Sequence, residues 1–432
     1  MQQLSCHAEV YESHVTELPV SLANNVDFLG RLPKLNRFSR FSELGLRPDI
    51  ESPLVEVRDF GPNPGSLRMF KFVPDKLQQV RGLVVVLHGC GQSAAGYNRG
   101  AGWATLAQHY GFALLVPEQQ SSNNANGCFN WFNADDIARD RGEAASIRQM
   151  IRRMSADHGI DAQRVFITGL SAGGAMAMVM LATYPEVFAG GAIIAGLPFG
   201  VATNLREALT GMRSSPARTP RKLGDLVRKA STHKGPWPKL SVWHGSADRV
   251  VHPGNANEIV KQWLDLHHLP QSPMSAGVVD GHPRQVWWNA DGETVVESYT
   301  ITDMAHGTPL GMADNEQRYG AQGAFLIEAG ISSSYHIAKF FGLTEWIREA
   351  KAETVETTPV AKKAAKPQRK PAAKQVVAAP AIPQVSMPDL AEVLWPLTTV
   401  RARPQPKDEP RRRGIDVGAV ITRALTAAGL MK

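Results

Sequence analysis

Apolar residues follow two different periods along this chain, and together these periods predict an α/β protein. Short runs in which nearly every residue is apolar are typical of strands buried on both faces of a parallel sheet. Such runs occupy residues 83–87, 112–117, 164–168, 189–195 and 240–244. Apolar residues at helical spacing predict helices over residues 103–107, 143–158, 174–182 and 254–267. Because strands and helices alternate, we expect a mostly parallel central sheet with helices on both faces.

Two further strand pairs are predicted by alternating segments joined by turn residues. Residues 55–58 and 68–74 read as an edge strand and its partner. Residues 285–288 and 295–300 flank a turn that contains Asn-Ala-Asp-Gly, the pattern of a hairpin. Neighbouring strand residues point to opposite faces. One of the two tryptophans at 287 and 288 is therefore expected to be exposed, beside the catalytic site that the sequence also predicts.

The chain divides into five regions by composition. Residues 1–50 have no strong period and are interpreted as an arm, whereas residues 51–350 hold the α/β domain. Within this domain, residues 198–238 are rich in Arg, Ser, Pro and Thr and are expected to form a cap-like insertion. An Ala/Lys/Pro-rich tract over 351–413 lacks the apolar residues that would offset the entropy of ordering it, and residues 414–432 have the rhythm of a short amphipathic helix.

The segment Gly169-Leu170-Ser171-Ala172-Gly173 lies between a predicted strand and a predicted helix. A G-x-S-x-G sequence in that position is the pattern of a nucleophile elbow, in which a tight turn presents the serine. Glycines on both sides allow strand and helix to approach closely. The context therefore predicts a nucleophilic Ser171, and the alternative is an ordinary serine cap at the start of a helix.

A serine hydroxyl needs a base to accept its proton and an acid to orient that base. In the order Ser, Asp, His, the acid candidate is Asp248, which follows the apolar run 240–244 in the sequence His-Gly-Ser-Ala-Asp. This position lies at the carboxyl edge of a parallel sheet, where α/β proteins place their sites. The alternative is a solvated loop aspartate.

The base must follow Asp248 in the chain. The histidines available are His252, His267, His268, His282, His306 and His336. We favour His306 because it lies in a short loop after the last strand, at 295–300, and has a glycine beside it. The alternative is a histidine in a surface loop.

Two backbone N–H groups are needed to hold the oxyanion of an acyl-transfer intermediate. Ala172, directly after the nucleophile, is the first candidate. Cys90 is the second, because it lies in the His-Gly-Cys-Gly-Gln loop that follows the run 83–87.

This loop, the Cys-Phe-Asn-Trp-Phe segment at 128–132 and the 169–173 elbow occur together and in order. The combination resembles the polyhydroxybutyrate depolymerase family of esterases, which includes feruloyl and acetylxylan esterases, over residues 55–345. The resemblance implies an α/β-hydrolase fold, a Ser171, Asp248 and His306 triad, an oxyanion donor at Cys90, and ester hydrolysis through an acyl-enzyme.

The implied substrate is poly- or oligo(3-hydroxybutyrate). One alternative is a feruloyl or acetylxylan esterase. Another is a binding protein that uses the fold as a scaffold and the basic tail as an anchor to granules or nucleic acid, against which the complete Ser, Asp, His order argues.

Four further residues near the proposed site have both a functional and a structural interpretation. Cys90 and Cys128 either form a disulfide that fixes the oxyanion loop or pack as two buried thiols. Trp131 and Phe132 are candidates for substrate contact, with core packing as the alternative. Gln92 is a third candidate for substrate contact.

The cluster Asp135, Asp136, Asp140 and Glu143 is better explained by a solvated face or by helix N-terminal charges than by a metal site, and we expect no metal and no cofactor.

The net charge of +7 is concentrated in the tail. Residues 351–432 hold 15 basic and 7 acidic residues, a net charge of +8, so the other 350 residues carry −1. The tail is therefore a candidate for contact with an anionic surface, with a solvated linker as the alternative. No zinc-ligand spacing or aromatic stacking motif predicts specific nucleic-acid recognition.

The compartment stays open at this stage. No run of about 18 apolar residues predicts a transmembrane helix, and the first residues lack the basic and apolar regions of a signal peptide. The family resemblance implies an extracellular protein, whereas the N-terminal sequence is compatible with a cytoplasmic one.

Overall fold

The computed structural model describes residues 52–75 and 80–344. The strands are β1 (Val55–Val57), β2 (Arg68–Phe72), β3 (Leu83–Leu87), β4 (Ala113–Glu118), β5 (Val165–Leu170), β6 (Gly190–Ile194), β7 (Lys239–Gly245), β8 (Ser275–Val279), β9 (His282–Trp288), β10 (Thr294–Ile301), β11 (Thr308–Leu310) and β12 (Leu326–Glu328). The α-helices are α2 (Ala94–Ala101), α3 (Trp103–Tyr110), α4 (Ala134–Ile137), α5 (Gly142–His158), α6 (Ala172–Thr183), α7 (Leu205–Ser214), α8 (Pro220–Arg228), α9 (Gly254–Leu266) and α10 (Ser333–Phe340).

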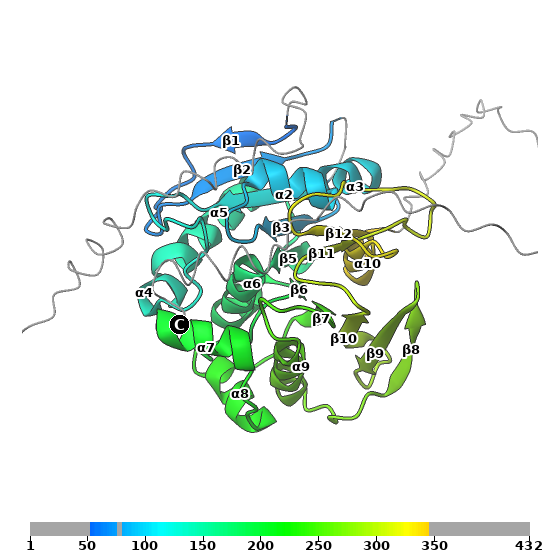
Figure 1. The fold of residues 1–432 in the computed structure, drawn as a ribbon. Coiled ribbons are helices and arrows are strands. Elements are labelled where there is room, and N and C mark those ends of the chain that lie inside the picture. The colour runs from blue at the N-terminus through cyan, green and yellow to red at the C-terminus, as the bar shows by residue number, and fades with distance from the viewer. Residues whose placement is uncertain (1–51, 76–79, 345–432) are drawn as a thin grey trace, which may run out of the picture. The chain divides into compact units, whose positions relative to one another are not determined.

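Ten strands form the central sheet, in the order β1-β2-β4-β3-β5-β6-β7-β10-β9-β8. The middle of the sheet, from β4 through β10, is parallel, and each end carries antiparallel strands. The predicted mostly parallel sheet with helices on both faces is therefore confirmed (Figure 1). The predicted hairpin is the β9–β10 pair.

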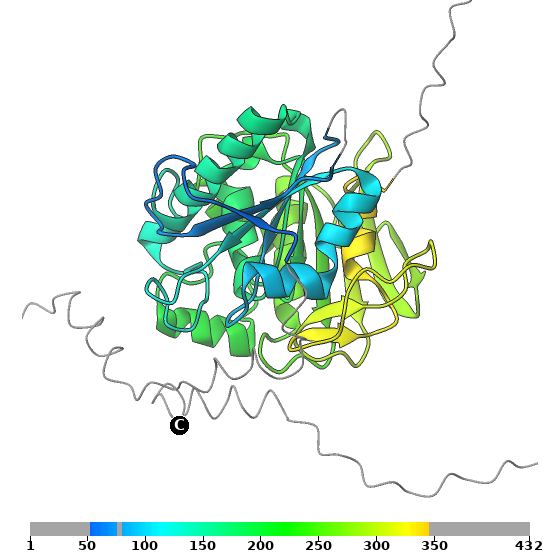
Figure 2. The ribbon, with the colours of Figure 1, turned by 90° about the horizontal axis from the view of Figure 1, so that it is seen from above.

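The sheet separates two hydrophobic clusters, and alternate residues of one strand enter different clusters. In β3, Leu83, Val85 and Leu87 pack with α5, α6, α8 and α9 on one face. Val84 and Val86 pack with α2, α3 and α10 on the other. This is why the strand is an unbroken apolar run, and Figure 2 shows helices on both sides of the strands.

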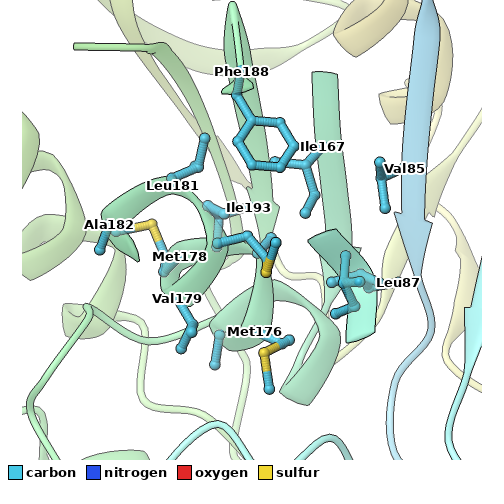
Figure 3. Packing of buried hydrophobic residues seen from close by; sticks show 14 of the residues in the cluster. Val85, Leu87, Ile167, Met176, Met178, Val179, Leu181, Ala182, Phe188 and Ile193 are labelled. Carbon is cyan, nitrogen blue, oxygen red and sulfur yellow. The ribbon is translucent and has the colours of Figure 1, made fainter. Parts of the chain in front are cut away.

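Helix α6, which begins at the predicted nucleophile, is buried along its whole length. Its apolar side chains meet those of β3, β5 and β6 (Figure 3). The residues shown there include Met176, Met178, Val179, Leu181 and Ala182 of the helix and Val85, Leu87, Ile167 and Ile193 of the strands. Such packing fixes the helix, and with it the turn that precedes it, against the centre of the sheet.

Several elements were not anticipated from the sequence. Strand β8, helices α2 and α10 and the small β11–β12 sheet belong to this group. The segment 198–238 forms α7 and α8, with Leu223 and Val227 buried in the same cluster as Ile259 of α9. The expectation that this segment acts as a cap stays a prediction.

The predicted arm at 1–50, the linker at 351–413 and the helix at 414–432 lie outside the described residues. Among the described helices, none has the length and apolar character needed to cross a lipid bilayer.

Candidate active site

Ser171 lies at the sharp turn between β5 and α6. Its backbone has φ 57° and ψ −117°, a conformation that is strained for a residue with a side chain. The Ser171 N–H donates to the Ile194 carbonyl at 2.9 Å, which fixes the turn to the neighbouring strand β6. Its hydroxyl makes no capping hydrogen bond to α6, so the interpretation of Ser171 as an ordinary helix cap is wrong.

The two glycines of the motif are required by contact distances. A Cβ on Gly169 would lie 2.4 Å from the Gly173 carbonyl carbon, and a Cβ on Gly173 would lie 2.4 Å from the Leu87 oxygen and 2.5 Å from the His88 oxygen. The first turn of α6 therefore packs directly on the end of β3. This contact brings the Ala172 amide to the loop that contains Cys90.

Asp248 follows β7, and its buried carboxylate accepts three hydrogen bonds and contacts a fourth nitrogen. Oδ1 accepts the backbone N–H groups of Val250 and Val251 at 2.8 and 2.9 Å. Oδ2 accepts from His306 Nδ1 at 2.7 Å and lies 3.2 Å from His244 Nε2. The Asp248 side chain is 0% exposed, so it is no solvated loop aspartate.

The contacts of Asp248 decide its charge. Burial alone would raise the pKa of its carboxyl, but hydrogen bonds from His244 and His306 outweigh burial and hold that pKa well below its usual range. Asp248 is therefore an ionised acceptor that fixes the Nδ1–H tautomer of His306 and leaves Nε2 of His306 to act on another group.

His306 follows β10 and is buried, so it is no surface-loop histidine. The strand before it is not the last one, because β11 begins two residues later. Gly245 allows the His306 loop to reach β7, since a Cβ there would lie 2.2 Å from the Met304 oxygen. The Phe325 ring stands edge-on to the imidazole, with ring centres 5.9 Å apart.

The structure brings Asp248 and His306 into direct contact and places Ser171 at the same edge of the sheet. The three residues follow β7, β10 and β5, whose carboxyl ends lie on one side because these strands are parallel. Strand β7 is the neighbour of β10, and β6 separates β7 from β5.

The Cys90 loop is fixed by a covalent bond and by hydrogen bonds. Cys90 and Cys128 form a disulfide, which settles the alternative of two thiols that the sequence leaves open. The Gly91 N–H donates to the Asn126 carbonyl at 2.9 Å, and the Gly89 N–H donates to Gln92 Oε1 at 2.9 Å. Among the hydrogen bonds of the described residues, none uses the Cys90 or Ala172 amide.

A buried polar network lies behind this loop and has Glu143 at its centre. Its carboxylate accepts from the side chains of Gln119, Asn123 and Asn130 and from the Asn130 amide. Gln119 also donates to the Cys128 carbonyl at 3.0 Å, which joins the network to the disulfide. Glu143 is in the first turn of α5 but fully buried, so its interpretation as part of a solvated face is wrong.

The candidate substrate-contact residues differ in their surroundings. Trp131 is buried in a core cluster and meets Phe132 edge to face, with ring centres 5.4 Å apart. Phe132 is only partly buried. Gln92 Nε2 donates to the Ala324 carbonyl at 3.3 Å, beside Phe325, so Gln92 connects the Cys90 loop to the segment against His306. Trp287 and Trp288 point to opposite faces, and Trp288 is the exposed one.

Ligand atoms that could hold a metal ion gather at one place in the described part of the chain, formed by Asp280, Asp314 and His336. The polar atoms there already bind protein groups. His336 Nε2 contacts Asp280 Oδ2 at 2.9 Å, and Lys339 Nζ contacts Asp314 Oδ2 at 2.6 Å. These contacts make the group a charge-paired surface cluster, and it shares no residue with the candidate active site.

Sequence reasoning missed His244, Glu143 and Phe325. His244 was visible as the first residue of the His-Gly-x-x-Asp segment, but its contact with Asp248 depends on how the loop folds back. Glu143 begins a helix, where an acidic residue is ordinary, and its burial follows from long-range packing. Phe325 is about 20 positions beyond His306 in a segment without a recognisable period.

Comparison with known proteins finds one family of esterases. The model of the family described as "Esterase PHB depolymerase" matches residues 70–276. Poly(3-hydroxyalkanoate) depolymerase C of Paucimonas lemoignei is 47% identical over 291 residues, which cover 67% of this chain and 70% of the relative. An acetylxylan esterase of Coprinopsis cinerea is 33% identical over 270 residues, covering 61% of this chain and 71% of the relative.

A solved structure gives the same fold. Acetyl xylan esterase from Aspergillus awamori superimposes with a TM-score of 0.57 at 24% identity, covering 67% of this chain and 99% of that one. At this identity the likeness shows the fold alone.

Proposed function

This chain belongs to the esterase PHB depolymerase family and is a carboxylic ester hydrolase, and we propose that it cleaves poly- or oligo(3-hydroxybutyrate) with Ser171 as the nucleophile. The substrate follows from the 47% identity to a poly(3-hydroxyalkanoate) depolymerase, which exceeds the 33% identity to an acetylxylan esterase. The roles of the residues follow from their contacts.

In the first step, the Ser171 hydroxyl oxygen attacks the ester carbonyl carbon. Nε2 of His306 accepts the hydroxyl proton, and the ionised Asp248 stabilises the imidazolium through its 2.7 Å contact with Nδ1. The negative charge on the carbonyl oxygen is held by the Cys90 and Ala172 amides, which have no competing hydrogen bond within the described residues.

In the second step, the tetrahedral intermediate loses the alcohol. His306 donates its proton to the leaving oxygen, the carbon–oxygen bond breaks, and an acyl group remains on Ser171. Water then attacks the acyl carbon while His306 takes one of its protons. The Ser171 oxygen leaves with that proton, and the hydroxy acid is released.

The observation that carries this proposal is the buried Asp248–His306 hydrogen bond beside a strained serine turn. Packing alone does not require a hydroxyl, an imidazole and an ionised carboxylate to follow three parallel strands at one edge of the sheet. The same observation argues against a binding protein that only uses the scaffold.

The test is Ser171→Ala, measured with a series of short p-nitrophenyl esters and with 3-hydroxybutyrate oligomers. We expect kcat to fall about 10⁵-fold or more on both substrates, with unchanged circular dichroism and melting temperature. Ser214→Ala is the matched control, because Ser214 is an exposed serine on α7. Turnover retained by Ser171→Ala would overturn the assignment.

The substrate panel also separates the alternative, a feruloyl or acetylxylan esterase, which the 31–33% identical relatives support. Release of 3-hydroxybutyrate supports the polyester substrate. Hydrolysis of methyl ferulate or acetylated xylan in the absence of oligomer cleavage would keep the mechanism and replace the substrate.

We further propose that the basic tail, net charge +8 over residues 351–432, holds the protein on an anionic surface such as a polymer granule. Cosedimentation of the full chain with polyester granules at low and high salt tests this. Binding that is lost at high salt supports an electrostatic contact, and binding that is insensitive to salt contradicts it.

A further inference from the structure

His244 is a second histidine on the carboxylate of Asp248, and we propose that it is a positioning residue for the triad. The inference rests on the proposed roles of Ser171, Asp248 and His306. It concerns the Oδ2 atom of Asp248, which contacts His306 Nδ1 at 2.7 Å and His244 Nε2 at 3.2 Å. One carboxylate oxygen is therefore shared between two imidazoles.

The surroundings of His244 fix which of its nitrogens carries hydrogen. Nε2 lies 2.9 Å from the Val251 carbonyl oxygen and 3.2 Å from Asp248 Oδ2. Both of these atoms only accept hydrogen bonds, so Nε2 must be the donor. Nδ1 is buried and has no hydrogen-bond partner in the described part of the chain.

This arrangement favours the Nε2–H tautomer of His244. A second proton would have to go on Nδ1, where the new N–H would be buried without an acceptor. His244 is only 3% exposed to solvent. The residue is therefore a donor of fixed tautomer, in contrast to His306, whose function requires it to gain and lose a proton.

The consequence for Asp248 is geometric and electrostatic. Two backbone amides hold Oδ1, and His244 Nε2 lies 3.2 Å from Oδ2, the oxygen that also contacts His306. His244 also takes part of the negative charge on Oδ2, which lowers the attraction that Asp248 exerts on the His306 imidazolium. The ionisable groups bonded to Asp248 within the described residues are these two histidines.

Two substitutions separate this role from simple packing. His244→Leu removes the donor and keeps an apolar side chain, whereas His244→Gln retains an N–H near the position of Nε2. We expect His244→Leu to lower kcat on a short p-nitrophenyl ester by about 10- to 100-fold, the effect of losing one hydrogen bond to a charged group. His244→Gln is expected to recover most of that loss.

The pH profile of kcat/KM gives a readout that a packing role would not produce. Without His244, the full charge of Asp248 faces His306, so the acid limb of the profile should move to higher pH. A general loosening of the packing around His244 would lower kcat without moving the limb to higher pH. An unmoved limb, or a shift to lower pH, overturns the proposal.

The control is His267→Gln. His267 Nε2 contacts the Pro238 carbonyl at 3.2 Å, so it shares the carbonyl contact of His244 without a carboxylate. We expect neither kcat nor the acid limb to change in this variant. Equal effects of His267→Gln and His244→Leu would show a general effect of losing a buried imidazole and would overturn the proposal.

A further measurement on the wild-type protein does not depend on activity or on folding of a variant. Nitrogen-15 spectra of histidine-labelled protein should show the hydrogen of His244 on Nε2. The Nδ1–H tautomer contradicts the proposal. If Ser171→Ala keeps its activity in the p-nitrophenyl ester assay, the proposed function fails. If Ser171→Ala loses activity and His244→Leu does not, only the proposed role of His244 is overturned.

Discussion

The loop after β7 and the first turn of α5 each bury a carboxylate that four nitrogen groups contact, and the two carboxylates differ in charge state. The four donors at Asp248 include two imidazoles, and its pKa lies well below the usual range in spite of burial. The four donors at Glu143 are all amides, and burial, together with the nearby Asp136, raises the pKa of Glu143 to about 8. The comparison teaches that the number of donors does not determine the charge of a buried acid. The charge of the buried acid depends instead on whether one of its partners can itself become positive.

The largest expected effect comes from removing the charge at the first of these carboxylates. Asp248→Asn should lower kcat about 10⁴-fold, because an amide at this position no longer fixes the His306 tautomer or stabilises its imidazolium. Steady-state kinetics on a short p-nitrophenyl ester measures this. Asp280→Asn is the matched control, since Asp280 is also paired with a histidine, His336, but outside the site. A fall in kcat of less than tenfold in Asp248→Asn would show that the charge of this carboxylate is not needed for catalysis.

The second prediction concerns the bond that joins the Glu143 network to the Cys90 loop. Replacing both Cys90 and Cys128 by Ser opens a cross-link between residues 38 positions apart, which should lower the free energy of unfolding by about 4 kcal/mol. Urea denaturation measures the change. Since Gln119 binds both Glu143 and the Cys128 carbonyl, we also expect lower kcat at temperatures where the variant is folded. Full kcat in the folded variant would show that the network does not reach the site.

The effect expected to be smallest for catalysis is a pH dependence of stability. A carboxyl with a pKa near 4.5 in the unfolded chain and about 8 in the folded chain holds an extra proton when folded. The stability that it contributes is full below about pH 4.5 and is lost as the pH rises through about 8. Asp248 has the opposite sign, because its stabilisation is lost as the pH falls below its usual value of 3.8.

Glu143→Gln should therefore flatten the curve of unfolding free energy between about pH 4.5 and 8. Urea midpoints measured across this range give the curve. Glu186→Gln, which alters a surface carboxylate paired with Arg139, should leave the slope as it is. Identical slopes in the wild type and Glu143→Gln would show that Glu143 is charged throughout and would end the contrast with Asp248.

The parts of the fold that could be predicted are those whose pattern is local. Leu83–Leu87 is a complete apolar run because each face of β3 meets a core. Strand β8 could not be predicted, because its Ser-Ala-Gly-Val-Val sequence is largely exposed and becomes a strand through pairing with β9. Likewise, α2 combines a weak apolar pattern with polar and glycine residues.

The candidate site divides in the same way. Ser171 was predictable because the G-x-S-x-G motif is a local pattern, although only Gly169 is required by a neighbour within the turn, and Gly173 is required by the end of β3. Asp248 and His306 could be chosen by their order along the chain, but their 2.7 Å contact depends on the pairing of β7 with β10. His244 and Glu143 have no local signal, because their partners are set by the folding back of a loop and by packing between α5 and the Cys90 loop.

The alternation of β3 between two cores has a consequence for how this family can change in length. A one-residue deletion within Leu83–Leu87 would send each following side chain to the opposite face and disturb both hydrophobic clusters at once. It would also displace His88 and Cys90, which directly follow the strand. We therefore expect a change of length within β3 to be far more damaging than one in a loop, because the strand sets the positions of the residues that follow it.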